Sequence, residues 1–233
     1  MREANSIRYP SSDRQTSLSS PPLFVAIVGG SASGKTWLSE KLGRVLGGKI
    51  ARISLDAFYR DRSHLSPRRR ARINFDNPAS IDWLTFARVL SDCSAGRKTQ
   101  IPCYDFKSHT RFARTQGLRP QDIVLVDGLW LLRRPSIRRF FGLSVFLECS
   151  TRGRLSRRVR RDLRSRGRTG KSVQEQFWNT VEPMHKKFVL PQRRRADVVL
   201  RGKWGMRQVR ELAMKLRSLR TGLGSGHATP VRL

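Results

Sequence analysis

The sequence predicts an α/β domain built on a doubly wound, mostly parallel sheet, and three observations support this prediction. Short apolar runs of strand length alternate along the chain with segments whose apolar residues recur at helical spacing. A glycine-rich loop at residues 29–36 lies between the first such run and the first helical segment. Asp127 directly follows a continuous apolar run, which is typical of the carboxyl end of a strand buried on both faces.

Length and composition agree with one domain of this kind. The chain has 233 residues, of which 38% are hydrophobic, and this is enough for one sizeable core. Its 48 Lys and Arg against 17 Asp and Glu give a formal net charge of +31, which indicates anionic partners, non-specific nucleic acid among them. The three cysteines have no metal-ligand or redox spacing, and no apolar run has the length of a membrane span or signal core. We therefore expect a cytoplasmic protein with reduced thiols and no membrane association.

The glycine-rich loop follows the apolar run at residues 23–28 and opens the helical segment at residues 37–46, which Gly47 and Gly48 end. Glycines let successive backbone N–H groups turn inward around an anion, and the helix N-terminus adds free donors and a positive dipole end. Such a loop uses its lysine for the β- and γ-phosphates and its threonine for Mg²⁺. The expected triphosphate site is Gly29, Gly30, Ser31, Ala32, Ser33, Gly34, Lys35 and Thr36.

The remaining elements follow from the same periodicities. Further strands are expected at residues 49–55, 123–126, 143–147 and 197–200. Further helices are expected at residues 81–90, with Ser80 as N-cap, and at residues 173–188 and 206–219. Residues 60–78 are expected to form a polar loop, residues 100–114 a small β-like insertion with aromatic residues, and residues 152–168 a very basic segment. Residues 23–220 then form the domain, between a disordered arm at 1–22 and a flexible tail at 221–233.

Two aspartates stand where chemistry is expected. Asp56 follows the second strand, and the carboxyl edge of an open α/β sheet is where ligands bind. Asp127 ends the strand at 123–126, the arrangement in which a carboxylate orients Mg²⁺ or its water. Thr36 and Asp127 are therefore the candidate metal residues.

Seven motifs together resemble the uridine–cytidine kinases, over about residues 24–202. The matching stretches are residues 29–36, 56–59, 74–78, 104–111, 154–162, 181–185 and 196–202. The resemblance implies phosphorylation of uridine or cytidine at the 5′-hydroxyl, with Mg²⁺ and with ATP, or alternatively GTP, as phosphoryl donor. It also implies a nucleoside-kinase type of P-loop fold, an arginine-rich helical lid at about 152–170, and a homo-oligomer.

The resemblance assigns roles to individual residues. Asp56 corresponds to the general base on the 5′-hydroxyl, and Asp76 to the carboxylate that grips the ribose 2′- and 3′-hydroxyls. Lys35 and the lid arginines correspond to residues that close on the triphosphate; the lid set is Arg161, Arg166 and Arg168. The acceptor set that it implies further contains Phe75, Tyr104, Phe106, His109, Arg158 and Gln176.

Other interpretations stay open at this point. Asp56 alternatively caps the next turn, and Asp76 forms an Asx turn before Pro78. Tyr104 and Phe106 alternatively belong to the core, and His109 to a solvated loop. A related kinase of another riboside or small hydroxyl substrate, or a P-loop protein that acts on nucleic acid, would show the same phosphate loop.

Two residues depart from the family pattern, and three histidines have no assigned partner. The family usually has Glu where this chain has Asp127, which withdraws the carboxylate by about one C–C bond, roughly 1.5 Å. Magnesium tolerates bridging water, so we expect outer-sphere coordination or reduced activity. Trp37 replaces a small residue and is expected to crowd the phosphate loop. His64, His185 and His227 are interpreted as surface or packing residues.

Overall fold

The main sheet of the protein is parallel throughout the described residues. The computed structural model describes residues 20–47, 50–202, 204–222 and 231–232. The strand order is β2-β5-β1-β6-β7-β8, and each neighbouring pair is parallel. The strands are β1 (Leu23–Gly29), β2 (Ile50–Ser54), β5 (Ile123–Gly128), β6 (Phe141–Leu147), β7 (Val198–Leu200) and β8 (Val231–Arg232). The predicted doubly wound parallel sheet is thereby confirmed.

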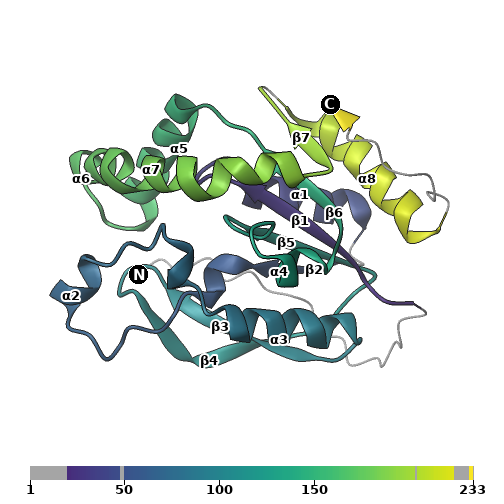
Figure 1. The fold of residues 1–233 in the computed structure, drawn as a ribbon, viewed down its shortest axis with the longest axis horizontal. Coiled ribbons are helices and arrows are strands. Elements are labelled where there is room, and N and C mark those ends of the chain that lie inside the picture. Colours follow the sequence, from purple (N-terminus) through teal and green to yellow (C-terminus); the bar gives the residue numbers. More distant parts are fainter. Residues whose placement is uncertain (1–19, 48–49, 203, 223–230, 233) are drawn as a thin grey trace.

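Helices cover the sheet on both faces (Figure 1). The α-helices are α1 (Lys35–Leu46), α2 (Pro67–Ala71), α3 (Trp83–Ser94), α4 (Pro135–Arg138), α5 (Thr151–Ser165), α6 (Gly170–Gln176), α7 (Glu182–Met184) and α8 (Met206–Arg220). Shorter 3₁₀ or π segments are η1 (Leu55–Phe58), η2 (Pro78–Ser80), η3 (Phe177–Val181), η4 (His185–Val189) and η5 (Leu190–Arg195).

The strand β1 separates two hydrophobic cores. Ala26 and Val28 face the core that includes α3, whereas Val25 and Ile27 face the core of α1 and α8. All four side chains are fully buried, which explains the unbroken apolar run in the sequence. From β1 the chain crosses to β2 on one side, and from β5 it later crosses to β6 on the other. The loop after β1 therefore lies where the strand order reverses, the usual ligand position in such sheets.

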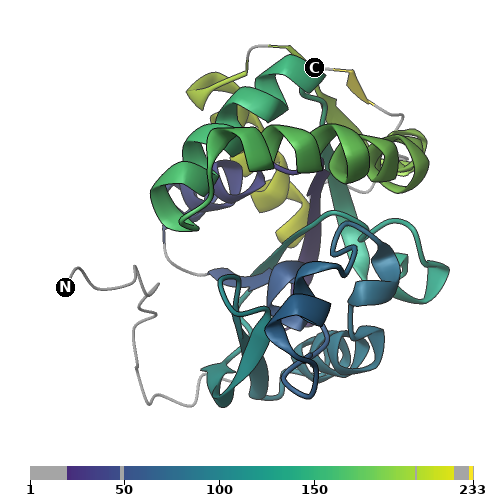
Figure 2. The same cartoon turned by 90° about the vertical axis from the view of Figure 1, so that its left-hand side faces the viewer.

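A hairpin outside the main sheet forms the predicted β-like insertion. Its strands β3 (Thr99–Asp105) and β4 (Thr110–Leu118) pair antiparallel as a separate two-stranded sheet. His109 in the turn has φ 57°, a left-handed conformation that few non-glycine residues adopt. In Figures 1 and 2 the hairpin and α2 lie below the main sheet, and the helices α5, α6 and α7 lie above it.

Three local predictions are wrong. Ser80 does not cap the helix that follows it, because it ends η2; Asp82 caps α3 instead and accepts a 3.1 Å hydrogen bond from the Thr85 amide. The polar loop predicted at residues 60–78 contains the helix α2. The helix predicted at residues 173–188 is interrupted by the π segments η3 and η4 on either side of α7. Pro183 lies between them and lacks the N–H that an α-helical ladder needs.

Several predictions concern residues outside the described part of the chain. The arm predicted at residues 1–22 lies almost wholly outside the described residues, as do Gly48 and His227. Most of the tail predicted from residue 221 is likewise outside them, and residues 231–232 pair with β7. No helix in the described ranges is both long and apolar enough to cross a membrane.

Candidate active site

The loop between β1 and α1 is tightly wound against its surroundings. A Cβ atom on Gly29 would lie 2.6 Å from the Ser33 hydroxyl, and one on Gly30 would lie 2.8 Å from the Arg154 side chain. Gly34 has φ 106°, and Ala32 has φ 60°. Glycine is therefore required at residues 29 and 30 because no side chain fits, and at residue 34 because of the backbone conformation.

Lys35 lies inside this loop at the start of α1. Its Nζ atom donates to the carbonyl oxygens of Gly29 and Gly30, both at 3.0 Å. Burial lowers the pKa of the Lys35 ammonium, while Asp56 and Asp127 act in the opposite direction. The loop thus holds one buried cation between backbone carbonyls and two carboxylates.

The two carboxylates come from adjacent strands. In the β2–β5 register Ser54 is paired with Asp127, and Asp56 follows two residues later in η1. Asp127 is 7% exposed and accepts a 3.3 Å hydrogen bond from the Ser54 hydroxyl. Burial and repulsion from Asp56 raise the pKa of Asp127 to about 6, although Lys35 partly offsets this shift. A buried carboxylate with so little compensation favours a cation beside it.

The residues at this point fit a magnesium ion in chemistry and number. Thr36 and Asp127 both line the same cavity, and hydroxyl and carboxylate oxygens are ligands that Mg²⁺ prefers. Within the described ranges no three His, Cys, Asp or Glu residues are grouped to enclose a metal. Magnesium is commonly held by one or two protein groups together with water and substrate phosphates, so this sparse set agrees with a phosphate-bridged ion.

An aromatic chamber lies across the cavity from the phosphate loop. Phe75 and His109 stack with ring centroids 4.2 Å apart and planes at 11°. The ring centroids of Tyr59 and Tyr104 are 5.3 Å apart, and those of Tyr104 and Phe106 are 5.2 Å apart. Burial and nearby arginines lower the pKa of His109, so its ring is neutral at neutral pH. The chamber offers flat apolar walls with a neutral imidazole, and Tyr104 and Phe106 form one of those walls.

Asp76 is directed into the cavity rather than into a turn. Two asparagines form the Asx turns around Pro78. Asn74 Oδ1 accepts from the Asp76 amide at 3.0 Å, and Asn77 Oδ1 accepts from the Ala79 amide at 2.9 Å. Burial raises the pKa of Asp76, Arg158 lowers it, and Asp56 raises it further. The Asp76 carboxylate is therefore free of local backbone bonds.

Arginines from α5 and the segment after it form the opposite wall. Asp162, which is fully buried, pairs with Arg158, Arg161 and Arg166 at 3.5, 2.8 and 3.6 Å. Gln176 Oε1 accepts from Arg168 and, at 2.9 Å, from Arg158. One carboxylate and one amide thereby hold four guanidinium groups together.

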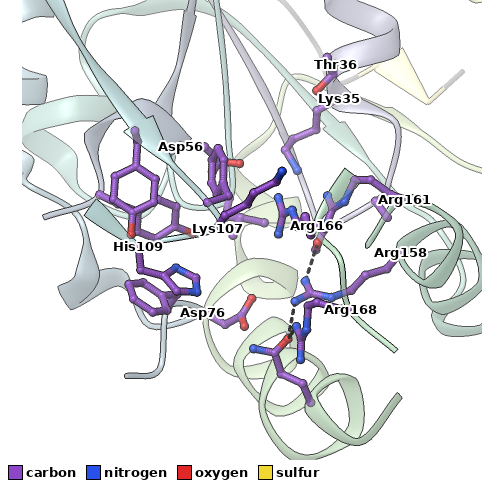
Figure 3. A pocket seen from close by; sticks show the side chains of 18 of the residues that line it. Lys35, Thr36, Asp56, Asp76, Lys107, His109, Arg158, Arg161, Arg166 and Arg168 are labelled. Atoms are coloured by element: carbon purple, nitrogen blue, oxygen red, sulfur yellow. Dashed lines mark hydrogen bonds between the residues drawn. The ribbon is translucent and has the colours of Figure 1, made fainter. Parts of the chain in front are cut away.

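A single cavity of about 810 Å³ joins these parts. Figure 3 shows Lys35 and the lid arginines on one side of it, with Asp76 and His109 opposite. The predicted residues that line it are Ser31, Ala32, Gly34, Lys35, Thr36, Asp56, Phe75, Asp76, Tyr104, Phe106, His109, Asp127, Arg158, Arg161, Arg166, Arg168 and Gln176. Of the predicted set, Gly29, Gly30 and Ser33 are not among its lining residues.

Sequence reasoning assigned no role to Arg111, which fastens the hairpin to the rest of the site. Its Nε donates to the Tyr59 carbonyl at 2.8 Å, and its Nη atoms donate to Asp82 at 3.2 Å and the Phe58 carbonyl at 3.3 Å. Its amide donates to Asp61 at 2.9 Å. Arg111 falls within a matching motif, but its partners lie about 30 to 50 residues away in sequence, and no local signal identifies them.

Other residues of the cavity wall were also missed, among them Tyr59, Arg70, Lys107 and Arg157. Arg157 donates to the Ser33 carbonyl at 3.3 Å, on the back of the phosphate loop. Tyr59, Lys107 and Arg157 fall within matching motifs but were given no role, and Arg70 falls in none of them.

Trp37 lines the cavity beside the loop, whereas His185 packs against the loop from outside the cavity. The Trp37 ring is 39% exposed and lies edge-to-face on Trp204 at 5.4 Å, while Trp204 lies against Gly34. His185 lies behind Gly30, where a Cβ atom would meet its Nδ1 at 2.9 Å. Burial and Arg154 lower the pKa of His185 to about 4, in agreement with a neutral packing residue.

Comparison with known families and proteins finds relatives that match most of the chain. The model described as "Phosphoribulokinase / Uridine kinase family" matches residues 24–204. A uridine kinase of Chloroflexus aurantiacus is 38% identical over 186 residues, which are 79% of this chain and 89% of that protein. A uridine kinase of Streptococcus equi subsp. zooepidemicus is 36% identical over 180 residues, 77% of this chain and 86% of that protein.

Solved structures share the fold. Phosphoribulokinase from Rhodobacter spheroides superposes with a TM-score of 0.58 at 16% identity, covering 76% of this chain and 68% of that one. D-glycerate 3-kinase from Cryptococcus neoformans superposes with a TM-score of 0.54 at 20% identity, covering 76% and 81% of the two chains. The α/β fold of P-loop kinases is thereby confirmed.

Replacement of Arg111 by alanine should loosen the hairpin. The variant loses three side-chain hydrogen bonds, one of them to a carboxylate, so we expect the free energy of unfolding to fall by about 1–3 kcal/mol. Hydrogen exchange should accelerate most in β3 and β4. Arg114→Ala on the exposed part of the same strand removes the same charge and should change stability by less than about 0.5 kcal/mol. Equal effects of the two variants, measured by urea unfolding, would contradict this assignment.

Asp127→Asn should stabilise the ligand-free protein at pH above 6. The folded pKa of Asp127, about 6, exceeds the ordinary 3.8, so the charged form opposes folding above pH 6, and this penalty vanishes as pH falls toward 4. Thermal melts should show a gain of about 2–4 °C per kcal/mol relieved at pH 7.5, and none near pH 4. Asp122→Asn, at a partly exposed pair with Arg220, is the matched control. A pH-independent gain would refute the assigned cause.

Proposed function

The chain belongs to the phosphoribulokinase / uridine kinase family, and we propose that it transfers the γ-phosphoryl group of ATP to the 5′-hydroxyl of uridine or cytidine. The observation that supports this most is the continuous cavity from the phosphate loop to the aromatic chamber, with Asp56 between them. Phosphoryl transfer needs donor and acceptor in line, and such a cavity accommodates both.

The donor end binds the triphosphate of ATP or GTP. Backbone amides of the loop and the N-terminus of α1 surround the phosphates, and Lys35 exchanges its carbonyl partners for phosphate oxygens. Thr36 and Asp127 would hold Mg²⁺, which supplies charge neutralisation on the phosphates when bound. Arg161, Arg166 and Arg168 approach from the lid and stabilise charge on the transferring group.

The acceptor end fits a pyrimidine ribonucleoside. The stacked Phe75–His109 pair and the Tyr104–Phe106 wall receive a flat ring, and a neutral imidazole serves as donor or acceptor toward uracil and cytosine alike. The Asp76 carboxylate offers two oxygens to the vicinal ribose hydroxyls. Arg158 and Gln176 lie on the sugar side.

Asp56 acts as the general base. Its position beside Lys35, at the carboxyl end of β2, places a carboxylate between the phosphate loop and the nucleoside chamber. A carboxylate there accepts the proton of the 5′-hydroxyl as the new P–O bond forms. Catalysis otherwise consists of positioning and charge stabilisation by Lys35 and the lid.

A substrate panel tests this proposal. Purified protein with ATP and Mg²⁺ should release ADP with uridine or cytidine, and far less with adenosine, D-glycerate or ribulose 5-phosphate. Lys35→Ala should lower kcat by about 10²–10³ and leave the melting curve cooperative. Turnover confined to a non-nucleoside alcohol, in a sample that binds ATP, would refute the nucleoside assignment but keep the kinase.

Asp76→Asn should weaken ribonucleoside binding selectively. Loss of charge-assisted hydrogen bonds of about 1.5–3 kcal/mol predicts a rise of about 10- to 100-fold in the KM for uridine, with the KM for ATP changed less than about twofold. The penalty should be smaller for 2′-deoxyuridine, which lacks one partner hydroxyl. Steady-state kinetics with both nucleosides measure this, and equal penalties for them would argue against a ribose contact.

A further inference from the structure

A second cationic region lies outside the cavity. It is formed by residues around α4 and by residues of η4 and η5. We call it the arginine surface. Its members are Arg133, Arg134, Arg139, Lys187, Arg194 and Arg195. They come from two stretches, residues 133–139 and 187–195, and Figure 1 shows α4 below the helical segment that contains α7. All six residues are exposed and five of them are arginines. None of the six lines the cavity.

Specific contacts bring the two stretches together. Arg195 Nη1 donates to the carbonyl oxygens of Leu132 and Arg133, at 3.2 and 3.3 Å. Arg133 and Lys187 both lie over the Phe188 ring, 5.1 and 5.3 Å from its centroid. Contacts of Arg133, Lys187 and Arg195 therefore join the two stretches that carry the arginine surface.

Aromatic rings also contact the cations at the two ends of α4. The Arg134 guanidinium lies 4.7 Å from the centroid of the Trp83 ring, and Arg139 lies 5.7 Å from that of Phe140. Partial burial lowers the pKa of Arg134, and repulsion from Arg133 and Arg60 adds to this. Ring contacts restrict these long side chains, so a ligand that binds them meets a smaller entropy cost.

The arginine surface has no acidic counterpart. Residues 133–139 and 183–195 contain neither Asp nor Glu. Across the described ranges, arginines at other positions form ion pairs with carboxylates, as Arg193 and Arg201 do with Glu148, but none of these six cations does. Like charges held side by side repel each other, and an anionic partner removes that penalty.

We propose that the arginine surface binds a single strand of nucleic acid, independently of the kinase site. Guanidinium groups donate two parallel hydrogen bonds to a phosphate and stack on bases, which suits a phosphodiester chain better than point charges do. The placement of guanidinium groups on aromatic rings favours this partner over an anionic lipid surface. The net charge of +31 supplies long-range attraction to the same partner.

The test uses the full chain and a fluorescein-labelled oligoadenylate of about 20 nucleotides, which exceeds common single-strand footprints of about 4–16. Binding is followed by anisotropy between about 50 and 200 mM salt. Each phosphate contact contributes about 0.7 to the slope of log K against log salt, so R133Q/R134Q/R194Q should lower the slope by about two. R114Q/R207Q/R210Q removes equal charge from β4 and α8 and should change it far less.

Further measurements distinguish binding at the arginine surface from diffuse attraction and from membrane binding. Both triple variants should retain ADP release and wild-type melting curves, so that a changed slope reports the arginine surface alone. An oligodeoxyadenylate tests whether the 2′-hydroxyl contributes. Equal slope losses in the two triple variants would overturn the proposal in favour of diffuse attraction. Stronger, patch-dependent binding to phosphatidylserine vesicles than to the oligonucleotide would overturn it in favour of a membrane surface.

Discussion

The site depends on the fact that parallel strands bring their carboxyl ends to one edge. β1, β2 and β5 are neighbours, so the glycine loop, Asp56 and Asp127 meet although about 100 residues separate the first from the last. Lys35 lies among these groups and is the cation that makes two nearby carboxylates tolerable in a buried place. The cluster remains undercompensated, since the pKa of Asp127 is still raised to about 6. Such a cluster is prepared for further positive charge and for phosphate, and the surrounding parts of the fold serve to deliver both.

The two walls of the cavity are held by different kinds of interaction. The lid wall consists of cations, and buried Asp162 with Gln176 keeps them together against their mutual repulsion. In the aromatic wall, Tyr104, Phe106 and His109 lie on a two-stranded hairpin, which alone is only marginally stable, and Phe75 and Tyr59 come from outside it. Arg111 joins that hairpin to the segment that follows Asp56 and to the N-cap of α3. The position of this wall is thus fixed both by long-range polar contacts and by packing of Phe75, Tyr104 and Phe106 against the core that contains Tyr59.

What could be predicted from sequence was the chemistry that is local. The phosphate loop, the buried strands and the aspartates at strand ends follow from short-range patterns, and the seven motifs pointed to the family. The errors arose where two local solutions compete, as for Ser80 and Asp82 at the start of α3, or where Pro183 changes the helical register. Arg111 and the arginine surface could not be predicted, because their partners are distant in sequence and an isolated arginine carries no sign of what it contacts.

The high positive charge has a different meaning in the two places where arginines gather. Around Asp162, four arginines (Arg158, Arg161, Arg166 and Arg168) each contact its carboxylate or the Gln176 amide, and these contacts position the guanidinium groups although one carboxylate offsets only part of their repulsion. On the arginine surface four of the six cations lie on the rings of Phe188, Trp83 and Phe140, which restrict their position without neutralising their charge. Polar side-chain partners therefore distinguish the four arginines of the cavity wall from those of the arginine surface, which have no carboxylate partner among the described residues. This distinction is physical, and neither the composition nor the net charge contains it.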